Sequence, residues 1–339
     1  MTDLKSWMDG VKSRVDSRLE RYFGEKLEEA SNISPDSVEL VEGVQSLTLR
    51  GGKRFRPMMV EAAYGAVSPG TTENAVDAGA SLEVLQSYLL IHDDWMDQDD
   101  ERRGGPAVHA MYRNRYDSHM ADSLAILCGD LACAYSLELL MHAPFAPEQL
   151  PKGLQIFLQL QKEVFFGQHL DITANPNVAK MHDLKTTSYT VRGPLLLGAS
   201  LAGASDEQNA VLTAYANPLG EAFQLADDLL GTFGDMATTG KPGNDVKNRK
   251  RTSLVGEAER LLAPGTRDAL DRVMAGEDKE GDVDAAIALL VSSGAKANVE
   301  NRLLQRADES KAALQGAPLD SAGIEILACL ADRLALRAV

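Results

Sequence analysis

Cysteine and basic residues are scarce in this chain of 339 amino acids. The three cysteines, Cys128, Cys133 and Cys329, have neither the spacing of a disulfide framework nor that of a zinc site, which fits a reducing, cytoplasmic setting. Only 34 lysines and arginines stand against 50 acidic residues, so the formal net charge is −16. This excess of negative charge argues against nucleic acid and against anionic lipid surfaces as partners.

Long apolar runs and linkers are also missing. No stretch approaches the roughly 20 continuous apolar residues of a membrane span, and residues 2–28 lack the apolar core of a signal peptide. Helical periodicity dominates, and no segment rich in Pro, Gly or Ser divides the chain. The sequence therefore predicts an all-α fold with a single domain over residues 1–339. Helices are expected over about residues 3–28, 35–50, 57–67, 72–97, 119–142, 147–173, 181–203, 206–231, 252–262, 266–275, 283–292, 294–314 and 320–337.

Two acidic segments are the most informative feature of the sequence. The first contains Asp93, Asp94 and Asp97, and the second contains Asp227 and Asp228. Positions i and i+4 of a helix share one face, so Asp93 and Asp97 point the same way. The residues before them are too apolar for a surface helix, and buried acids are costly unless they are paired or bind a metal. Paired carboxylates suit Mg²⁺, which takes few protein ligands and binds phosphates as well. A solvated helix face is the alternative.

A basic segment complements these acids. Residues 51–57 open with two glycines, which let the backbone approach a ligand, and continue with three cations. Arginine matches phosphate oxygens with a planar fork, and lysine acts as a point charge. A second basic pair, Arg102 and Arg103, follows the first acidic segment. Alone, a basic loop is usually just solvated; beside paired acids, it predicts a site for Mg²⁺ and diphosphate together.

Seven short motifs in a fixed order resemble those of the trans-isoprenyl diphosphate synthases, the polyprenyl synthetase family. The resemblance implies an isoprenoid synthase fold, which is a large helical bundle around a central cavity. It also implies condensation of isopentenyl diphosphate with dimethylallyl, geranyl or farnesyl diphosphate, with about three Mg²⁺ ions per site, in a homodimer. The motifs span roughly residues 40–255 and are Gly51-Gly52-Lys53-Arg54-Phe55-Arg56-Pro57, Leu90-Ile91-His92-Asp93-Asp94-Trp95-Met96-Asp97, Arg102-Arg103-Gly104, Gly129-Asp130-Leu131, Gly167-Gln168-x-x-Asp171, Lys185-Thr186 and Phe223-Gln224-Leu225-Ala226-Asp227-Asp228.

The same resemblance distributes the roles among individual residues. The metal ions are assigned to Asp93, Asp97 and Asp227, with Asp94 and Asp228 in support. Isopentenyl diphosphate is assigned to Lys53, Arg56, Gln86 and Arg103. The allylic substrate and its developing carbocation are assigned to Arg102, Lys185, Thr186, Gln224 and Lys241, with Lys250 as a flap lysine.

Two departures from the family pattern limit this transfer. Gly231 stands where many members have a third Asp in the second acidic motif. Only two residues separate Asp94 from Asp97, so the chain-length rules of members with a longer first motif transfer poorly. Residues 231–252 are rich in Gly, Thr, Lys and Asp, and we interpret them as a flap over the diphosphate. A plain surface connection is the alternative.

Product length is predicted from the helix that carries the first motif. At 1.5 Å rise per residue, Tyr88 and Leu89 lie about 6–8 Å from Asp93 along that helix. The resemblance places chain-length control at these two positions, and a single aromatic residue at the first of them is similar to geranylgeranyl-type enzymes. We therefore expect geranylgeranyl diphosphate (C20), with farnesyl diphosphate (C15) as the other candidate. Ordinary core packing of Tyr88 is the alternative.

Two other functions are compatible with the same fold. A terpene cyclase has no reason to carry Lys53, Arg56 and Arg103, because it binds no second diphosphate. A non-catalytic subunit of a heteromeric synthase usually lacks the first acidic motif or its arginines, and this chain has both. Turnover by the purified protein alone separates these three functions.

Overall fold

Helices make up most of the described structure. The computed structural model describes residues 3–173, 175, 177–234 and 244–336. Within these residues the only strands form one short hairpin, so the predicted all-α fold is confirmed.

Two compact units divide the chain according to its internal contacts. Unit 1 comprises Met1–Leu158, Pro194–Asn209 and Leu319–Gly323, and unit 2 comprises Gln159–Gly193, Ala210–Pro318 and Ile324–Val339. Each unit is thus assembled from separate stretches of the sequence, and the organisation of residues 1–339 as a single domain stays a prediction.

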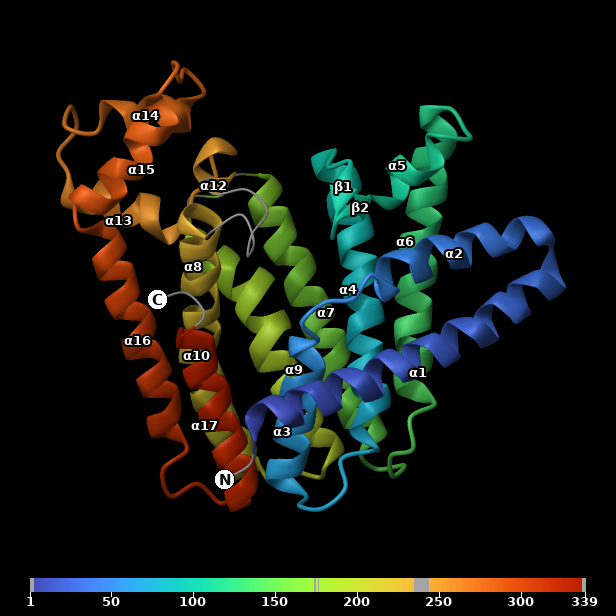
Figure 1. Cartoon of the computed structure of the whole chain (residues 1–339). Coiled ribbons are helices and arrows are strands. Elements are labelled where there is room, and N and C mark those ends of the chain that lie inside the picture. Colours follow the sequence, from blue (N-terminus) through green and yellow to red (C-terminus); the bar gives the residue numbers. More distant parts are fainter. Residues whose placement is uncertain (1–2, 174, 176, 235–243, 337–339) are drawn as a thin grey trace. The chain divides into compact units, whose positions relative to one another are not determined.

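Unit 1 holds the first acidic motif. Its elements are α1 (Leu4–Ile33), the 3₁₀ turn η1 (Pro35–Ser37), α2 (Val38–Leu49), α3 (Phe55–Val67), α4 (Ala75–Asp97), β1 (Glu101–Arg102), β2 (Gly105–Pro106), α5 (Val108–Tyr112) and α6 (Ser118–Met141). Helices α4 and α6 pack along one another, and α1 packs across α4 (Figure 1). The core that they share with α2 includes fully buried side chains such as Leu19, Phe23, Leu47, Val84 and Leu139.

Unit 2 holds the second acidic motif. It contains α8 (Val178–His182), the π-helix η2 (Asp183–Arg192), α12 (Asn244–Lys247), α13 (Ser253–Leu261), α14 (Asp268–Ala275), α15 (Asp282–Ser292) and α16 (Ala295–Ala313). Four further helices have residues in both units: α7 (Leu150–Ile172), α9 (Gly193–Leu201), α10 (Asp206–Phe233) and α17 (Ser321–Leu336). Within unit 2, the buried hydroxyl of Tyr215 on α10 donates to the carbonyl oxygen of Leu327 on α17 at 2.7 Å.

The predicted helices agree with the observed ones to within a few residues at most ends, but three features were not expected from the sequence. The segment after α4 forms the hairpin β1–β2, with Glu101 opposite Pro106 and Arg102 opposite Gly105. Both residues of its turn have positive φ, 52° at Arg103 and 71° at Gly104, which is the signature of a tight hairpin turn. The short helices α5 and α12 were not predicted, and the predicted helix over 181–203 contains the π-helix η2.

Among the helices that the structure describes, one, α6, is long and apolar enough to cross a membrane by length and composition alone. It carries the acidic residues Asp122, Asp130 and Glu138, so no continuous apolar run of that length exists in the sequence. The helix packs against α2, α4 and α5, as the core helix of a globular unit does. Buried core helices pass the same composition test, so α6 gives no ground for a membrane span.

Two helical glycines of unit 1 differ in the space around them, which predicts opposite effects on stability when each is replaced by alanine. A Cβ added to Gly198 on α9 would lie 2.1 Å from the carbonyl oxygen of Val60, whereas a Cβ on Gly24 of α1 would meet nothing within 4 Å. We expect Gly198→Ala to lower the free energy of unfolding by about 1–3 kcal/mol through overpacking. Gly24→Ala should raise it by about 0.5–1 kcal/mol through helix propensity. Chemical denaturation of both variants checks this, and a stable Gly198→Ala protein would contradict the packing.

Candidate active site

The first acidic motif forms the last turn of α4 in unit 1. Asp93 is half-buried and Asp97 is exposed, four residues apart, as the helical spacing predicts. Asp94 has no exposure, and its Oδ1 accepts hydrogen bonds from Nε of Arg102 at 2.7 Å and from Nη2 of the same guanidinium. Burial raises the pKa of Asp94, and Arg102 acts in the opposite direction. The buried aspartate therefore binds an arginine, while its two neighbours remain accessible to a ligand.

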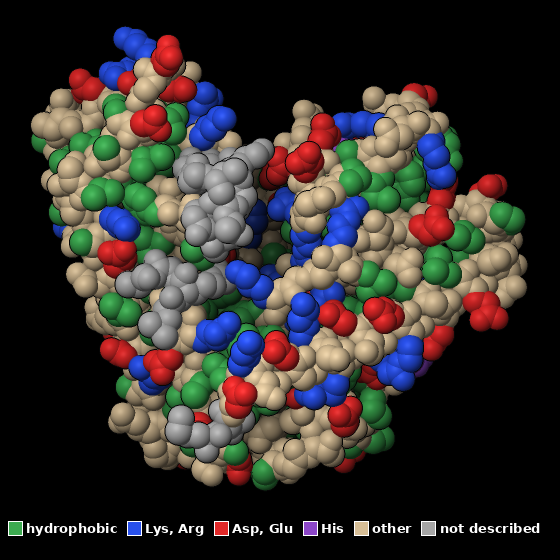
Figure 2. All heavy atoms as spheres, in the orientation of Figure 1, with side chains coloured by type: hydrophobic (Ala, Val, Ile, Leu, Met, Phe, Trp, Pro, Cys, Tyr) green, Lys and Arg blue, Asp and Glu red, His purple; other side chains and the backbone are tan. Residues whose placement is uncertain are grey.

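The hairpin after α4 brings the second basic pair back to the glycine loop. Helix α4 ends where Gln98 adopts a left-handed conformation, with φ of 58°. The β1–β2 turn then directs Nη1 of Arg103 to the carbonyl oxygen of Gly51, at 2.8 Å. From the other side, Nη1 of Arg50 donates to the carbonyl oxygens of Arg102 at 3.0 Å and Pro106 at 2.7 Å. Acidic and basic side chains consequently gather side by side around this hairpin (Figure 2).

The three cations of the glycine loop differ in exposure. Lys53 is exposed and Arg56 is half-buried, whereas the side chain of Arg54 is only 1% exposed. Gln86, on α4, is half-buried. Unit 1 thus brings together the loop, the hairpin and the first acidic motif, and it keeps Arg54 away from solvent.

The second acidic motif lies on α10 in unit 2 and shows the same division between neighbours. Asp227 is exposed, and Asp228 is only 3% exposed. Oδ1 of Asp228 accepts a hydrogen bond from Nε2 of Gln224 at 2.7 Å, and Oδ2 accepts one from the backbone N–H of Ser253 at 2.7 Å. Burial raises the pKa of Asp228, and these hydrogen bonds act in the opposite direction. Both oxygens of Asp228 already have protein donors, so Asp227 is the residue of this pair that faces solvent.

Lys185 and Thr186 lie on the π-helix η2, a type of distortion that is frequent at functional sites. Nζ of Lys185 donates to Oδ2 of Asp171 on α7, and both side chains are partly exposed. Helix α7 approaches very closely here, because a Cβ on Gly167 would lie 2.5 Å from the backbone nitrogen of Lys185. The two motifs that carry Gly167 and Lys185 in the sequence are therefore in direct contact. Thr186 is half-buried.

Gly231 has a neighbour that the sequence did not reveal. A Cβ on Gly231 would lie 1.9 Å from Oδ2 of Asp245, so the carboxylate of Asp245 fills the space in which a side chain at position 231 would begin. Asp245 is 14% exposed and lies 3.1 Å from Nζ of Lys250. An acid missing at position 231 and an acid in the segment predicted as a flap are the signals that could have linked the two residues. Lys241, the other lysine predicted for that segment, lies outside the described residues.

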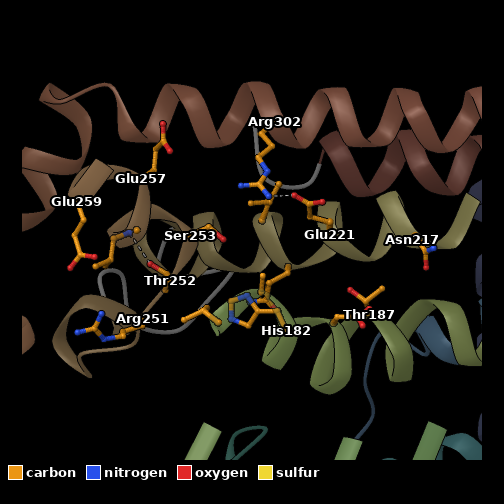
Figure 3. Close-up of a pocket in the computed structure, with 17 residues that line it drawn as sticks. His182, Thr187, Asn217, Glu221, Arg251, Thr252, Ser253, Glu257, Glu259 and Arg302 are labelled. Carbon is orange, nitrogen blue, oxygen red and sulfur yellow. Dashed lines mark hydrogen bonds and ion pairs between the residues drawn. The ribbon is translucent and has the colours of Figure 1, made fainter. Parts of the chain in front are cut away.

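A cavity of about 570 Å³ lies along α10 in unit 2 (Figure 3). His182 and Thr187 face α10 from α8 and η2, and Glu221 on α10 pairs with Arg302 on α16. Gln224 is part of the lining, but none of the five aspartates assigned to metal is. Burial lowers the pKa of His182. This cavity is therefore not the metal site that the sequence predicts.

Tyr88 lies where α4 meets α6. Its ring packs edge to face on the imidazole of His92, with 4.9 Å between centroids, and burial raises its pKa to about 12. Nε2 of His92 lies 3.2 Å from the carbonyl oxygen of Ile126, and a Cβ on Gly129 would be 2.1 Å from that Nε2. A glycine at position 129 thus leaves room for His92, which in turn supports Tyr88. Leu89 is half-buried.

Comparison with known proteins gives consistent matches. The family model described as polyprenyl synthetase matches residues 38–290. Geranylgeranyl diphosphate synthase of Sulfolobus acidocaldarius is 33% identical over 257 residues, 70% of this chain and 74% of the relative. Geranylfarnesyl diphosphate synthase of Aeropyrum pernix is 30% identical over 319 residues, 90% of this chain and 96% of the relative. The crystal structure of geranylgeranyl pyrophosphate synthase from Corynebacterium glutamicum, complexed with isoprenyl diphosphate and magnesium, has a TM-score of 0.88 and 32% identity, covering 97% of this chain and 99% of that chain.

The two hydrogen bonds of Asp228 predict a stability effect. We expect Asp228→Ala to lower the free energy of unfolding by about 2 kcal/mol, because it leaves the N–H of Ser253 and the Gln224 amide without their acceptor. Asp308 is 75% exposed in an ion pair with Lys311 on α16 and serves as the control. Asp308→Ala should cost less than about 0.5 kcal/mol. Chemical denaturation measures both, and equal effects of the two changes would rule out the structural role of Asp228.

Proposed function

The chain belongs to the polyprenyl synthetase family and is a prenyltransferase, and we propose that it makes geranylgeranyl diphosphate as its main product from isopentenyl diphosphate and allylic diphosphates. The observation that carries this proposal is in unit 1. There, Asp93 and Asp97 end an apolar helix, and the hairpin beside them links Arg103 to the loop that carries Lys53. Carboxylates for cations and a separate cluster of cations for a second diphosphate are what this condensation requires.

The acidic side chains suit magnesium by their chemistry. Asp93, Asp97 and Asp227 offer hard carboxylate oxygens, and Asp94 and Asp228 support them from buried positions. Within the described residues no group of three or more His, Cys, Asp or Glu side chains forms a ready-made metal site. Mg²⁺ needs no such closed site, because it keeps several waters and shares substrate phosphates. We propose about three such ions per site, as the family resemblance implies, and when bound they neutralise the charge of the departing diphosphate.

The protein's own residues then have to stabilise charge and exclude water. As the allylic C–O bond breaks, the electron pair leaves with the diphosphate, and Arg102, Lys185 and Lys241 are proposed to bind that anion. The π electrons of isopentenyl diphosphate form the new C–C bond, and the departed diphosphate takes up the released proton. Thr186 and Gln224 are proposed to flank the carbocation, with Lys250 closing the flap. Apolar helices keep water from the cation until the new bond has formed.

Product length is the least constrained part of the proposal, because the compared relatives make products of different length. Tyr88 supports C20, since it is the large side chain that precedes the acidic motif by five residues and its ring is held by His92. Farnesyl diphosphate remains the second candidate. A terpene cyclase or a non-catalytic subunit is disfavoured by the basic groups of the loop and the hairpin.

One assay separates these functions. The purified protein is incubated with Mg²⁺, isopentenyl diphosphate and dimethylallyl, geranyl or farnesyl diphosphate, and the products are resolved by reverse-phase chromatography. Consumption of isopentenyl diphosphate by this chain alone supports the synthase. Cyclic products without consumption of isopentenyl diphosphate would identify a cyclase, and complete inactivity would identify a subunit that needs a partner.

A second copy of the chain is proposed as a partner. Helix α6 presents an apolar stripe with Met120, Leu127 and Met141 at 48%, 50% and 56% exposure. Large exposed apolar side chains at this spacing along one helix are typical of a protein interface. The family resemblance implies a homodimer, and this stripe supports that arrangement.

Metal binding predicts a large loss of turnover in Asp97→Ala. A metal contact supplies several kcal/mol of charge stabilisation in the transition state, so kcat should fall by about a thousandfold or more. Helix content by circular dichroism should be unchanged, because Asp97 is exposed at the end of α4. Glu101→Gln, an exposed acid on the nearby hairpin, is the matched control and should keep normal turnover. Near-normal activity of Asp97→Ala would remove Asp97 from the metal site.

Product length predicts a shift in Tyr88→Ala. Smaller residues, Val84, Ser81 and Ala80, lie one to two turns before Tyr88 on α4, so removing the ring should open a path for a longer chain. We expect products longer than C20 from Tyr88→Ala and an unchanged product from Tyr88→Phe, which keeps the ring. Reverse-phase analysis of the products measures this shift. The same product ladder in both active variants would mean that another helix forms the cavity floor.

A further inference from the structure

Arg54 is a charged residue of the glycine loop that the proposed chemistry does not use. It follows Lys53 and precedes Arg56 by two positions, yet its side chain is only 1% exposed. Its backbone adopts a left-handed conformation, with φ of 51° and ψ of 37°, directly before the first residue of α3. Such a conformation is uncommon for a residue with a long side chain and persists only when the surroundings hold it. Arg54 therefore has a different role from the two exposed or half-buried cations beside it.

Three separate helices supply acceptors to the guanidinium of Arg54. Nε donates to Oδ1 of Asp16 on α1 at 2.7 Å, and Nη1 donates to Oε2 of Glu83 on α4 at 2.6 Å. Nη2 donates to the carbonyl oxygen of Thr48 on α2 at 3.0 Å. Glu83 is only 2% exposed, and Asp16 is 32% exposed. Because the donors of a guanidinium are fixed in one plane, three acceptors on three helices define both its position and its orientation.

Two of the elements joined by Arg54, the start of α3 and helix α4, carry the residues Lys53, Arg56 and Gln86 that are proposed for isopentenyl diphosphate. Glu83 lies one helical turn before Gln86 on α4, and the neighbouring Ser87 is hydrogen-bonded to Oγ1 of Thr48 at 2.7 Å. The loop itself contains Gly51 and Gly52 with φ of 89° and 149°, which gives its backbone little stiffness of its own. The side chain of Arg54 thus fixes the position of the start of α3 relative to α1, α2 and α4.

We propose that Arg54 is a positioning residue for isopentenyl diphosphate, which fixes Lys53 and Arg56 relative to Gln86 without touching the substrate. This inference rests on the proposed function, because it takes the pocket of Lys53, Arg56, Gln86 and Arg103 as the site of that diphosphate. A displacement of about 1 Å in a binding group is enough to cost up to a hundredfold in rate. Loss of the guanidinium should therefore affect isopentenyl diphosphate far more than the allylic substrate.

A purely structural role is the competing explanation, and unit 1 offers a matched control for it. Arg14 on α1 pairs with Glu61 on α3, and Glu61 is only 3% exposed. This pair also joins α3 to α1 around a buried glutamate, but neither of its residues belongs to the proposed pocket. Arg14→Met and Arg54→Met each leave a buried acid without its arginine, so both should lower the melting temperature.

The experiment compares Arg54→Met, Glu83→Gln and Arg14→Met with the wild-type protein. Calorimetric titration with isopentenyl diphosphate, without allylic substrate, measures binding in the absence of any reaction. We expect the dissociation constant to rise by about tenfold or more in Arg54→Met and in the same direction in Glu83→Gln, with less than about a twofold change in Arg14→Met. In the steady state, KM for isopentenyl diphosphate should rise in Arg54→Met and Glu83→Gln. KM for the allylic substrate should stay within about twofold of the wild-type value in both variants.

Each outcome bears on one of the two proposals. If the wild-type protein does not bind isopentenyl diphosphate, the proposed function fails. If the wild-type protein binds it and the Arg54 and Glu83 variants bind it equally well, the positioning role of Arg54 is wrong. Equal weakening in Arg14→Met would show a general loss of stability and would also overturn the inference. Should Arg54→Met not fold, Glu83→Gln, which keeps the size of the side chain, decides the question.

Discussion

The pairing of Asp94 with Arg102 is the interaction on which the organisation of the first motif depends. A carboxylate with no exposure at the end of an apolar helix is stable only if a cation and hydrogen bonds compensate its lost hydration. Arg102, on β1, reaches Asp94 because the chain turns back at Gln98, the left-handed residue that ends α4. The β1–β2 turn that follows sends Arg103 to the glycine loop, so the segment around this partly buried ion pair brings the acidic and the basic side chains of unit 1 together.

The two adjacent aspartates of each acidic motif differ in exposure and in hydrogen bonding. In each Asp-Asp pair the first residue is the more exposed, and the second is buried and bound to the protein. Neighbouring positions on a helix point about 100° apart, so one residue can face a ligand while the next faces the core. Asp94 binds an arginine, and Asp228 binds the start of α13 and the amide of Gln224. A double acid in a sequence of this kind therefore indicates one accessible carboxylate and one buried anchor, not two equivalent groups.

Sequence reasoning reached the helices because they have a strong local signal, and the predicted site residues rest on local patterns of the same kind. Long apolar helices show a 3.6-residue period, and acids four residues apart share a face whatever the tertiary structure. Long-range contacts carry no such signal. Nothing around residue 54 indicates that one of the three cations of the loop is buried among α1, α2 and α4, because its partners Asp16 and Glu83 lie 38 and 29 residues away. The hairpin was also missed, since its strands are two residues long and its charged composition resembles that of a loop.

Three glycines allow close contacts between segments that are distant in the sequence, because each leaves room that a side chain would fill. At Gly129, Gly167 and Gly231 an added Cβ would lie within 2.5 Å of His92, of the backbone of Lys185 and of Asp245, respectively. Each glycine belongs to a motif or departure that the sequence marks, and each contacts a residue from another marked segment. These glycines thus mark places where two segments of the chain approach each other to van der Waals distance. Gly231 is therefore not simply a lost acid, because its missing side chain leaves the space that the carboxylate of Asp245 occupies.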